Sequence, residues 1–221
     1  MGTITRTFAN NITTSGVFKP TAFNNASFDN VTSVPEGALP AGGNMVLLST
    51  QTASASASIN FTSGIDSTYK EYMFLFNNIH PASTSDFSFN FSTDGGSNYN
   101  VTKTTTAFKA QHQEDDGGTA SVSYQGGQDL AQSTSYKILA ENSGADADLG
   151  CSGYLHLFNP SSTTYVKHFI STISMTNGIV PRADVWYMAG YGNTTSAINA
   201  IDFKMSSGNI DAGTIQMFGI L

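Results

Sequence analysis

From Gly43 to the last residue, short apolar stretches alternate with clusters of Gly, Ser, Asn and Asp, and none of these stretches has helical spacing. Short runs with a two-residue period, bounded by such turn formers, are typical of β-strands. The clearest run is Asp86 to Phe91, in which Phe87, Phe89 and Phe91 alternate with polar residues. The pattern predicts an all-β chain of about ten to thirteen strands.

The arrangement of these strands is predicted from what the sequence lacks. No amphipathic helices separate the strands, which disfavours a doubly wound fold, and no 20- to 50-residue repeat suggests a propeller or solenoid. Many short strands with regular turn signals favour an antiparallel β-sandwich, and we expect a jelly roll. The stretch Tyr69 to Phe76 is apolar on both faces. We therefore expect it to be a central strand that is covered on both sides.

Composition excludes several classes of function. Charged residues make up 11% of the chain, against roughly 25% in ordinary domains. A net charge of −7 and nine scattered Lys and Arg residues disfavour binding to nucleic acid or to an anionic membrane surface. No apolar stretch approaches the roughly 20 residues of a membrane helix, and no apolar signal segment follows Met1. We expect no membrane partner and no secretion by that route.

Residues 1–42 differ from residues 43–221, which we expect to form the sandwich. The first segment holds three of the six prolines, and its apolar residues follow neither a helical nor a strand period. Such a segment cannot form its own core, so it is either a disordered leader or an extended arm that orders against a neighbouring subunit or partner. In the second interpretation, the residues that bind the partner are Phe8, Ile12, Phe18, Phe23 and Phe28.

Candidate metal and thiol chemistry is weak. Cys151 has no His or acidic residue beside it, which favours a core thiol over a nucleophile. The four histidines, which are His80, His112, His156 and His168, show no metal-ligand spacing. The acidic loop from Glu114 to Gly118 lacks the spacing of a calcium loop, and so do Asp146 and Asp148. We expect no metal and no cofactor.

Catalytic motifs are also missing from the sequence. No Gly-x-Ser-x-Gly elbow occurs, and the paired glycines are explained as turns, so we expect a protein that is not an enzyme. A glycan-cleaving pair of carboxylates stays open as an alternative, since distant acids can meet in space. Trp186, Tyr187 and Tyr191 could stack on sugars, pack in the core or make a subunit contact. Trp186 and Tyr187 should point to opposite faces of their strand.

Three stretches together resemble virion structural proteins of tailed bacteriophages, particularly those of marine bacteria and cyanobacteria. They are the leader (Thr5 to Asn10, Phe28 to Val31 and Met45 to Thr50), the stretch from Phe61 to Tyr69 continued by Glu71 to Pro81, and the ending Gly213 to Ile220. Proteins of this kind are labelled tail-fibre-like or head-associated. The resemblance implies a β-rich, oligomeric protein on the particle surface, and it implies no catalytic residues.

Two functions follow as expectations from the resemblance and from the arm-plus-sandwich organisation. The first is a capsid-surface cement or decoration subunit, which is made in the host cytoplasm and lies on the surface of the virion. It would form a homotrimer, anchor to the major capsid protein through residues 1–42 and stabilise the shell. The second is a tail-fibre or receptor-binding subunit, which docks to a tail protein and contacts host glycan through loops of the sandwich.

Overall fold

The computed structural model of the protein describes residues 45–118 and 120–221. These residues contain twelve strands and one short 3₁₀ helix, η3. In chain order they are β1 (Met45–Thr52), β2 (Ile59–Phe61), β3 (Glu71–Pro81), β4 (Ser85–Ser92), β5 (Lys103–Gln113), β6 (Ser121–Tyr124), η3 (Gly126–Gln128), β7 (Lys137–Ser143), β8 (Cys151–Phe158), β9 (Lys167–Thr176), β10 (Arg182–Gly192), β11 (Ala200–Met205) and β12 (Ile210–Ile220).

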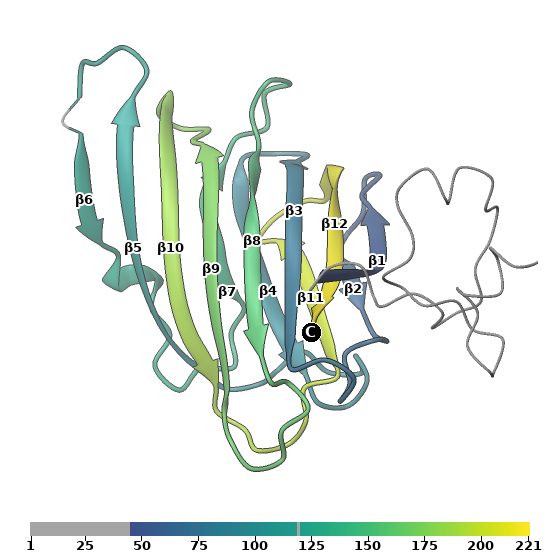
Figure 1. Ribbon diagram of the computed structural model, residues 1–221. Helices are drawn as coiled ribbons and strands as arrows, with labels where there is room; N and C mark the ends of the chain where they lie inside the picture. Colours follow the sequence, from purple (N-terminus) through teal and green to yellow (C-terminus); the bar gives the residue numbers. More distant parts are fainter. Residues whose placement is uncertain (1–44, 119) are drawn as a thin grey trace, which may run out of the picture. The chain divides into compact units, whose positions relative to one another are not determined.

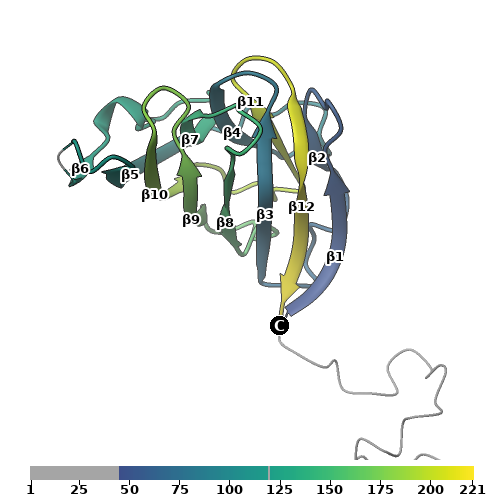
Figure 2. The ribbon, with the colours of Figure 1, turned by 90° about the horizontal axis from the view of Figure 1, so that it is seen from above.

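The strands form two antiparallel sheets that pack against each other. The large sheet has eight strands in the order β1-β12-β3-β8-β9-β10-β5-β6, and the small sheet has four in the order β2-β11-β4-β7. Figure 1 views the large sheet from its outward side, with the small sheet behind it, and Figure 2 shows the two layers from above. The predicted all-β antiparallel sandwich is therefore confirmed. The jelly-roll topology stays a prediction, because this strand order does not establish it.

Aromatic side chains fill the space between the sheets. Phe203 of β11 lies at their centre, with ring centroids 5.1 Å from Phe76, 5.5 Å from Phe74 and 6.0 Å from Phe87. The alternation of Phe87, Phe89 and Phe91 places all three rings in this core, where none is exposed. Such ring pairs add to the burial of apolar area, which is the main force that holds the layers together.

The outward side of the small sheet is covered by the chain itself. On β4 the polar residues between the phenylalanines are buried as well as the phenylalanines, which the alternation did not predict. Asn90 shows why, since its Nδ2 donates hydrogen bonds to the carbonyl oxygens of Tyr99 (2.7 Å) and Thr134 (2.9 Å). The segments that precede and follow β5 in the chain therefore lie over the outward side of this sheet.

Within the described residues, the outward side of the large sheet has no such cover. On the central strand β3, Tyr72, Phe74 and Phe76 are buried, whereas Met73 and Leu75 point outward and are only partly buried. The expectation that this stretch is covered on both sides is thus wrong within the described residues, because all four strands of the small sheet pack on one side. Two apolar positions of a central strand are left facing outward.

Three lysines are fully buried, and the sequence did not predict this. Lys103 Nζ donates to Asn90 Oδ1 and to Val101 O (2.8 Å), and Lys137 Nζ donates to Gln128 O (2.6 Å). The third, Lys167, donates to two backbone carbonyls. Burial disfavours the charged form, and it lowers the pKa of Lys103 to about 7 and that of Lys137 to about 8.

Candidate functional site

Three neighbouring rows of the outward side chains of the large sheet form a surface that we call the outer face. Cross-strand register aligns them in three rows. The first row is Tyr124, Phe108, Tyr187, Thr172, Tyr154, Leu75 and Gln216; the second is Thr106, Ala189, Ile170, His156, Met73, Phe218 and Leu47; the third is Thr104, Tyr191, His168, Phe158, Glu71, Ile220 and Met45. In Figure 1 this face points toward the reader.

Most members of these rows are aromatic or aliphatic, although they lie on the outside of the protein. Among the most exposed are Leu47 (52%), Ile170 (47%) and Phe108 (45%). Single exposed apolar residues are ordinary, but a contiguous patch across a whole sheet marks a binding surface. The apolar character follows from strands such as β3 that carry apolar residues on both faces.

Three aromatic residues at one end of the first row form what we call the aromatic ledge: Tyr124, Phe108 and Tyr187. The rings of Phe108 and Tyr187 stack with their centroids 4.9 Å apart and their planes 16° apart. Tyr124 pairs with Phe108 across β6 and β5, and its hydroxyl donates a hydrogen bond to Asp129. Stacking and this hydrogen bond hold the ledge in place. Its rings would therefore lose little side-chain conformational entropy when a partner binds.

Next to the ledge lies a depression of about 430 Å³, which we call the hollow. It is present because the second row has a small residue, Ala189, between bulkier neighbours. Its lining is mainly apolar and comprises Thr104, Thr105, Thr106, Phe158, His168, Phe169, Ile170, Ala189, Gly190 and Tyr191. A side chain or ring that enters it would contact apolar groups on several sides.

The outer face carries almost no charge. Glu71 is the only acidic residue in the three rows, and they contain no Lys or Arg. Its Oε2 lies 3.0 Å from Nε2 of His156, although the two atoms do not form a hydrogen bond of good geometry. The net charge of −7 of the chain therefore resides elsewhere.

A polar pocket of about 780 Å³ opens beside the 144–150 loop. His80 lies in it, with Nε2 3.1 Å from Asp146 O and Nδ1 3.9 Å from Asp211 Oδ2. Ser152 Oγ instead accepts a hydrogen bond from the backbone N–H of Asn78 at 2.9 Å. Among the described residues no hydrogen bond joins this histidine to the serine, so the two are not arranged as the base and nucleophile of acyl transfer.

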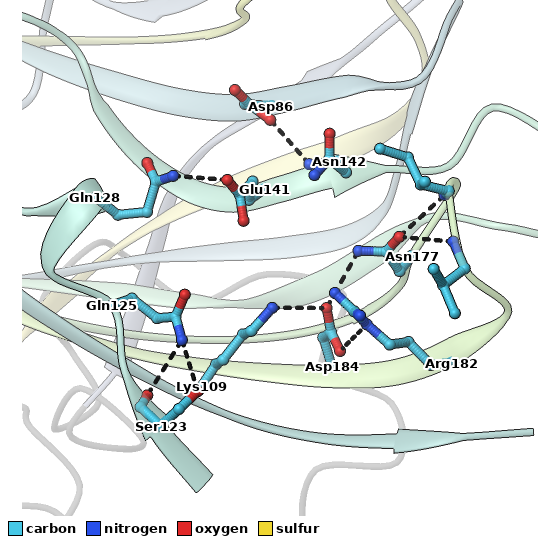
Figure 3. Close-up of polar contacts among 12 residues, drawn as sticks. Asp86, Lys109, Ser123, Gln125, Gln128, Glu141, Asn142, Asn177, Arg182 and Asp184 are labelled. Atoms are coloured by element: carbon cyan, nitrogen blue, oxygen red, sulfur yellow. Dashed lines mark hydrogen bonds and ion pairs between the residues drawn. The ribbon is translucent and has the colours of Figure 1, made fainter. Parts of the chain in front are cut away.

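A buried polar cluster at the β5–β10 end of the sandwich is shown in Figure 3. Asp184 accepts a hydrogen bond from Arg182 Nε (2.9 Å) and another from Asn177 Nδ2 (3.3 Å), and Lys109 Nζ lies 3.8 Å from its Oδ2. Asn177 Oδ1 in turn accepts two backbone N–H groups of the turn that follows it. Arg182 and Lys109 both lie beside the one carboxylate of Asp184, and Asn177 links this carboxylate to the turn, so we assign the cluster to fixing this turn.

Some of the residues considered for chemistry from sequence meet, as His80 does with Asp146 and His112 with Asp116. In residues 45–118 and 120–221, no three His, Cys, Asp or Glu side chains are grouped to hold a metal ion. Cys151 is buried, and burial raises the pKa of its thiol to about 12, which agrees with the predicted core thiol. His112 contacts Asp116 of the acidic loop at 3.2 Å, and both side chains are exposed.

The aromatic residues near β10 separate as predicted. Trp186 is fully buried, whereas Tyr187 is 38% exposed on the outer face, and Tyr191 lines the hollow. The sequence did not identify Phe108, Tyr124 and Ile170 as members of an exposed apolar surface. The signal that could have indicated such a surface was the excess of apolar residues on both faces of the strands. The five predicted arm residues, which are Phe8, Ile12, Phe18, Phe23 and Phe28, lie outside the described residues.

No described helix is both long enough and apolar enough to cross a membrane. The chain matches no protein-family model, no curated protein and no solved structure.

Proposed function

We propose that this chain is a structural component of a bacteriophage particle, a capsid-surface cement or decoration subunit that acts through contact area and catalyses no reaction. The observation that carries the proposal is the outer face, an apolar and nearly uncharged surface across an eight-stranded sheet. An enzyme needs convergent polar groups, whereas a subunit of an assembly needs apolar area to bury.

The sequence supports the same proposal independently. The stretches that resemble virion proteins include β3 and β12, which contribute Met73, Leu75 and Phe218 to the outer face. In this function, residues 1–42 anchor the subunit to the major capsid protein, and the sandwich contacts neighbouring subunits. The homotrimer stays a prediction from the sequence.

Localisation on purified particles tests the proposal most directly. Labelled antibody against the protein should bind the capsid at high copy number. Deletion of residues 2–42 should abolish its occupancy on particles while the sandwich stays folded. Unchanged occupancy would reject the arm as the anchor, and absence of the protein from particles would reject the function as a whole.

A second candidate function, a tail-fibre subunit that contacts host glycan, is favoured by one feature. The hollow combines aromatic side chains with the hydroxyl-bearing residues Thr104, Thr106 and Tyr191. The C–H faces of a neutral sugar ring pack on such groups while its hydroxyls take the polar ones. Few copies at the tail, together with glycan binding that Tyr191→Ala removes and Tyr165→Ala keeps, would support this function. Tyr165 is a matched control because it is 70% exposed and does not line the hollow.

A further inference from the structure

The charge of the outer face determines which partners it can accept. Glu71 is its one carboxylate and lies beside His156. Two like-charged surfaces repel each other when they approach, and a chain with a net charge of −7 repels its own copies over most of its surface. The outer face escapes this repulsion. It can therefore meet an identical face with little local repulsion between charges.

The shape of the outer face is self-complementary, because it carries both a projecting ledge and a hollow. The ledge residue Tyr187 and the hollow residue Ala189 are two positions apart on β10 and point to the same side. That spacing is roughly 7 Å. A two-fold axis between the two features would bring the ledge of each copy to the hollow of the other. In such a contact every favourable pairing occurs twice, which is the property of an isologous interface.

The size of the face is also sufficient. Eight strands at about 4.8 Å spacing span roughly 34 Å, and three rows with side chains extend about 20 Å along the strands. The area is on the order of 700 Å² per copy, close to the roughly 800 Å² that each partner contributes to a stable protein interface. Face-to-face packing of two sheets is itself a common arrangement in β-proteins.

We propose that two copies of this chain pack through their outer faces, with the aromatic ledge of each seated against the hollow of the other. The inference rests on the proposed function, in that it names the partner of the same contact surface. A two-fold contact closes at two copies. For this face the proposal is therefore a dimer, in place of the trimer that the sequence suggested.

The mass of the full-length protein in solution tests the dimer. Sedimentation velocity should give twice the chain mass of 23.4 kDa, with dissociation on dilution. Ile170→Arg should place an unpaired charge in the contact and weaken the dimer by about a hundredfold or more. Ile179→Arg is the matched control, because Ile179 is also exposed (68%) but lies in the β9–β10 turn.

A second pair of variants separates a lost contact from a lost fold. Ala189→Leu fills the hollow and should dissociate the dimer, whereas Ala183→Leu makes the same change on the same side of β10, outside the three rows. Both should keep the wild-type circular dichroism spectrum. Either a monomeric wild type at every concentration or dimers unaffected by Ile170→Arg and Ala189→Leu would overturn the inference. A trimer that Ile170→Arg dissociates would overturn its two-fold arrangement.

These experiments distinguish a failure of the dimer proposal from a failure of the proposed particle function. A dimer that is absent from purified particles would refute the particle function and leave the paired faces intact. A monomer that occupies the capsid would refute the paired faces and leave the particle function intact. Binding of neutral methyl glycosides to a monomeric wild type, lost in Ile170→Arg, would assign the hollow to sugar and refute the pairing.

Discussion

Raising the pH from neutral to mildly alkaline should stabilise this protein. Burial holds the folded-state pKa of Lys103 at about 7 and that of Lys137 at about 8, below the ordinary value of 10.5 that the unfolded chain recovers. Between these values the unfolded chain binds protons that the folded protein does not, so the free energy of unfolding rises with pH. This stabilisation is complete above the unfolded pKa and is lost as the pH falls through the folded pKa.

The size of the effect follows from the two pKa values. One proton contributes about 1.4 kcal/mol per pH unit, so from pH 7 to pH 9 Lys103 adds about 2 kcal/mol and Lys137 about 1 kcal/mol. Two other buried groups also act in this range. Burial lowers the pKa of Lys167, which adds to the gain. Burial raises the pKa of the Cys151 thiol to about 12, so the unfolded chain loses this proton first and the thiol offsets up to about 1 kcal/mol of the gain by pH 9. Burial also raises the pKa of Tyr72 and Tyr136 above the usual value, so both stay protonated.

Urea unfolding at pH 7, 8 and 9, followed by fluorescence of the single, buried Trp186, measures the change. Lys103→Met should remove about 2 of the roughly 3 kcal/mol gained by the wild type over this range. Lys70→Met is the control, because Lys70 is exposed, and it should keep the full gain. The reasoning is refuted if wild-type stability stays flat from pH 7 to pH 9, or if Lys103→Met gains as much as the wild type.

Three further predictions concern stability, and urea unfolding measures each. Phe203→Ala should cost about 3–5 kcal/mol, since it empties the centre of the aromatic core; a loss below 1 kcal/mol would contradict the packing described. Gly153→Ala should be strongly destabilising, because its Cβ would lie 2.2 Å from a carbonyl oxygen of the neighbouring strand, whereas Gly127→Ala meets open space and should be nearly neutral. Burial raises the pKa of Asp202, so its charged form opposes folding as the pH rises above the ordinary carboxyl range. Asp202→Asn, which keeps an acceptor for the Tyr136 hydroxyl, should therefore stabilise the protein by about 1 kcal/mol at pH 7 and by less near pH 4; a constant difference between these pH values would count against the burial argument.

Sequence alone predicted the features that depend on neighbouring residues. In a strand, successive side chains point to opposite sides, so the pattern around Phe89 and the opposite orientations of Trp186 and Tyr187 could be predicted without knowledge of the fold. The shortage of charge and the absence of helical periodicity indicated an all-β protein in the same local way. The buried thiol of Cys151 followed from the residues beside it.

Tertiary structure alone decided which residues meet and which side of each sheet is covered. Tyr124 and Leu47 belong to one outer face because strand pairing joins segments that are far apart in the chain, and no local pattern specifies that order. Lys103 is buried because Asn90 and the chain around it close over its ammonium group, although its own strand pattern suits a surface position. The small sheet packs on one side of the large sheet only, and this one-sided burial turns a two-sided apolar strand such as β3 into a surface for a partner.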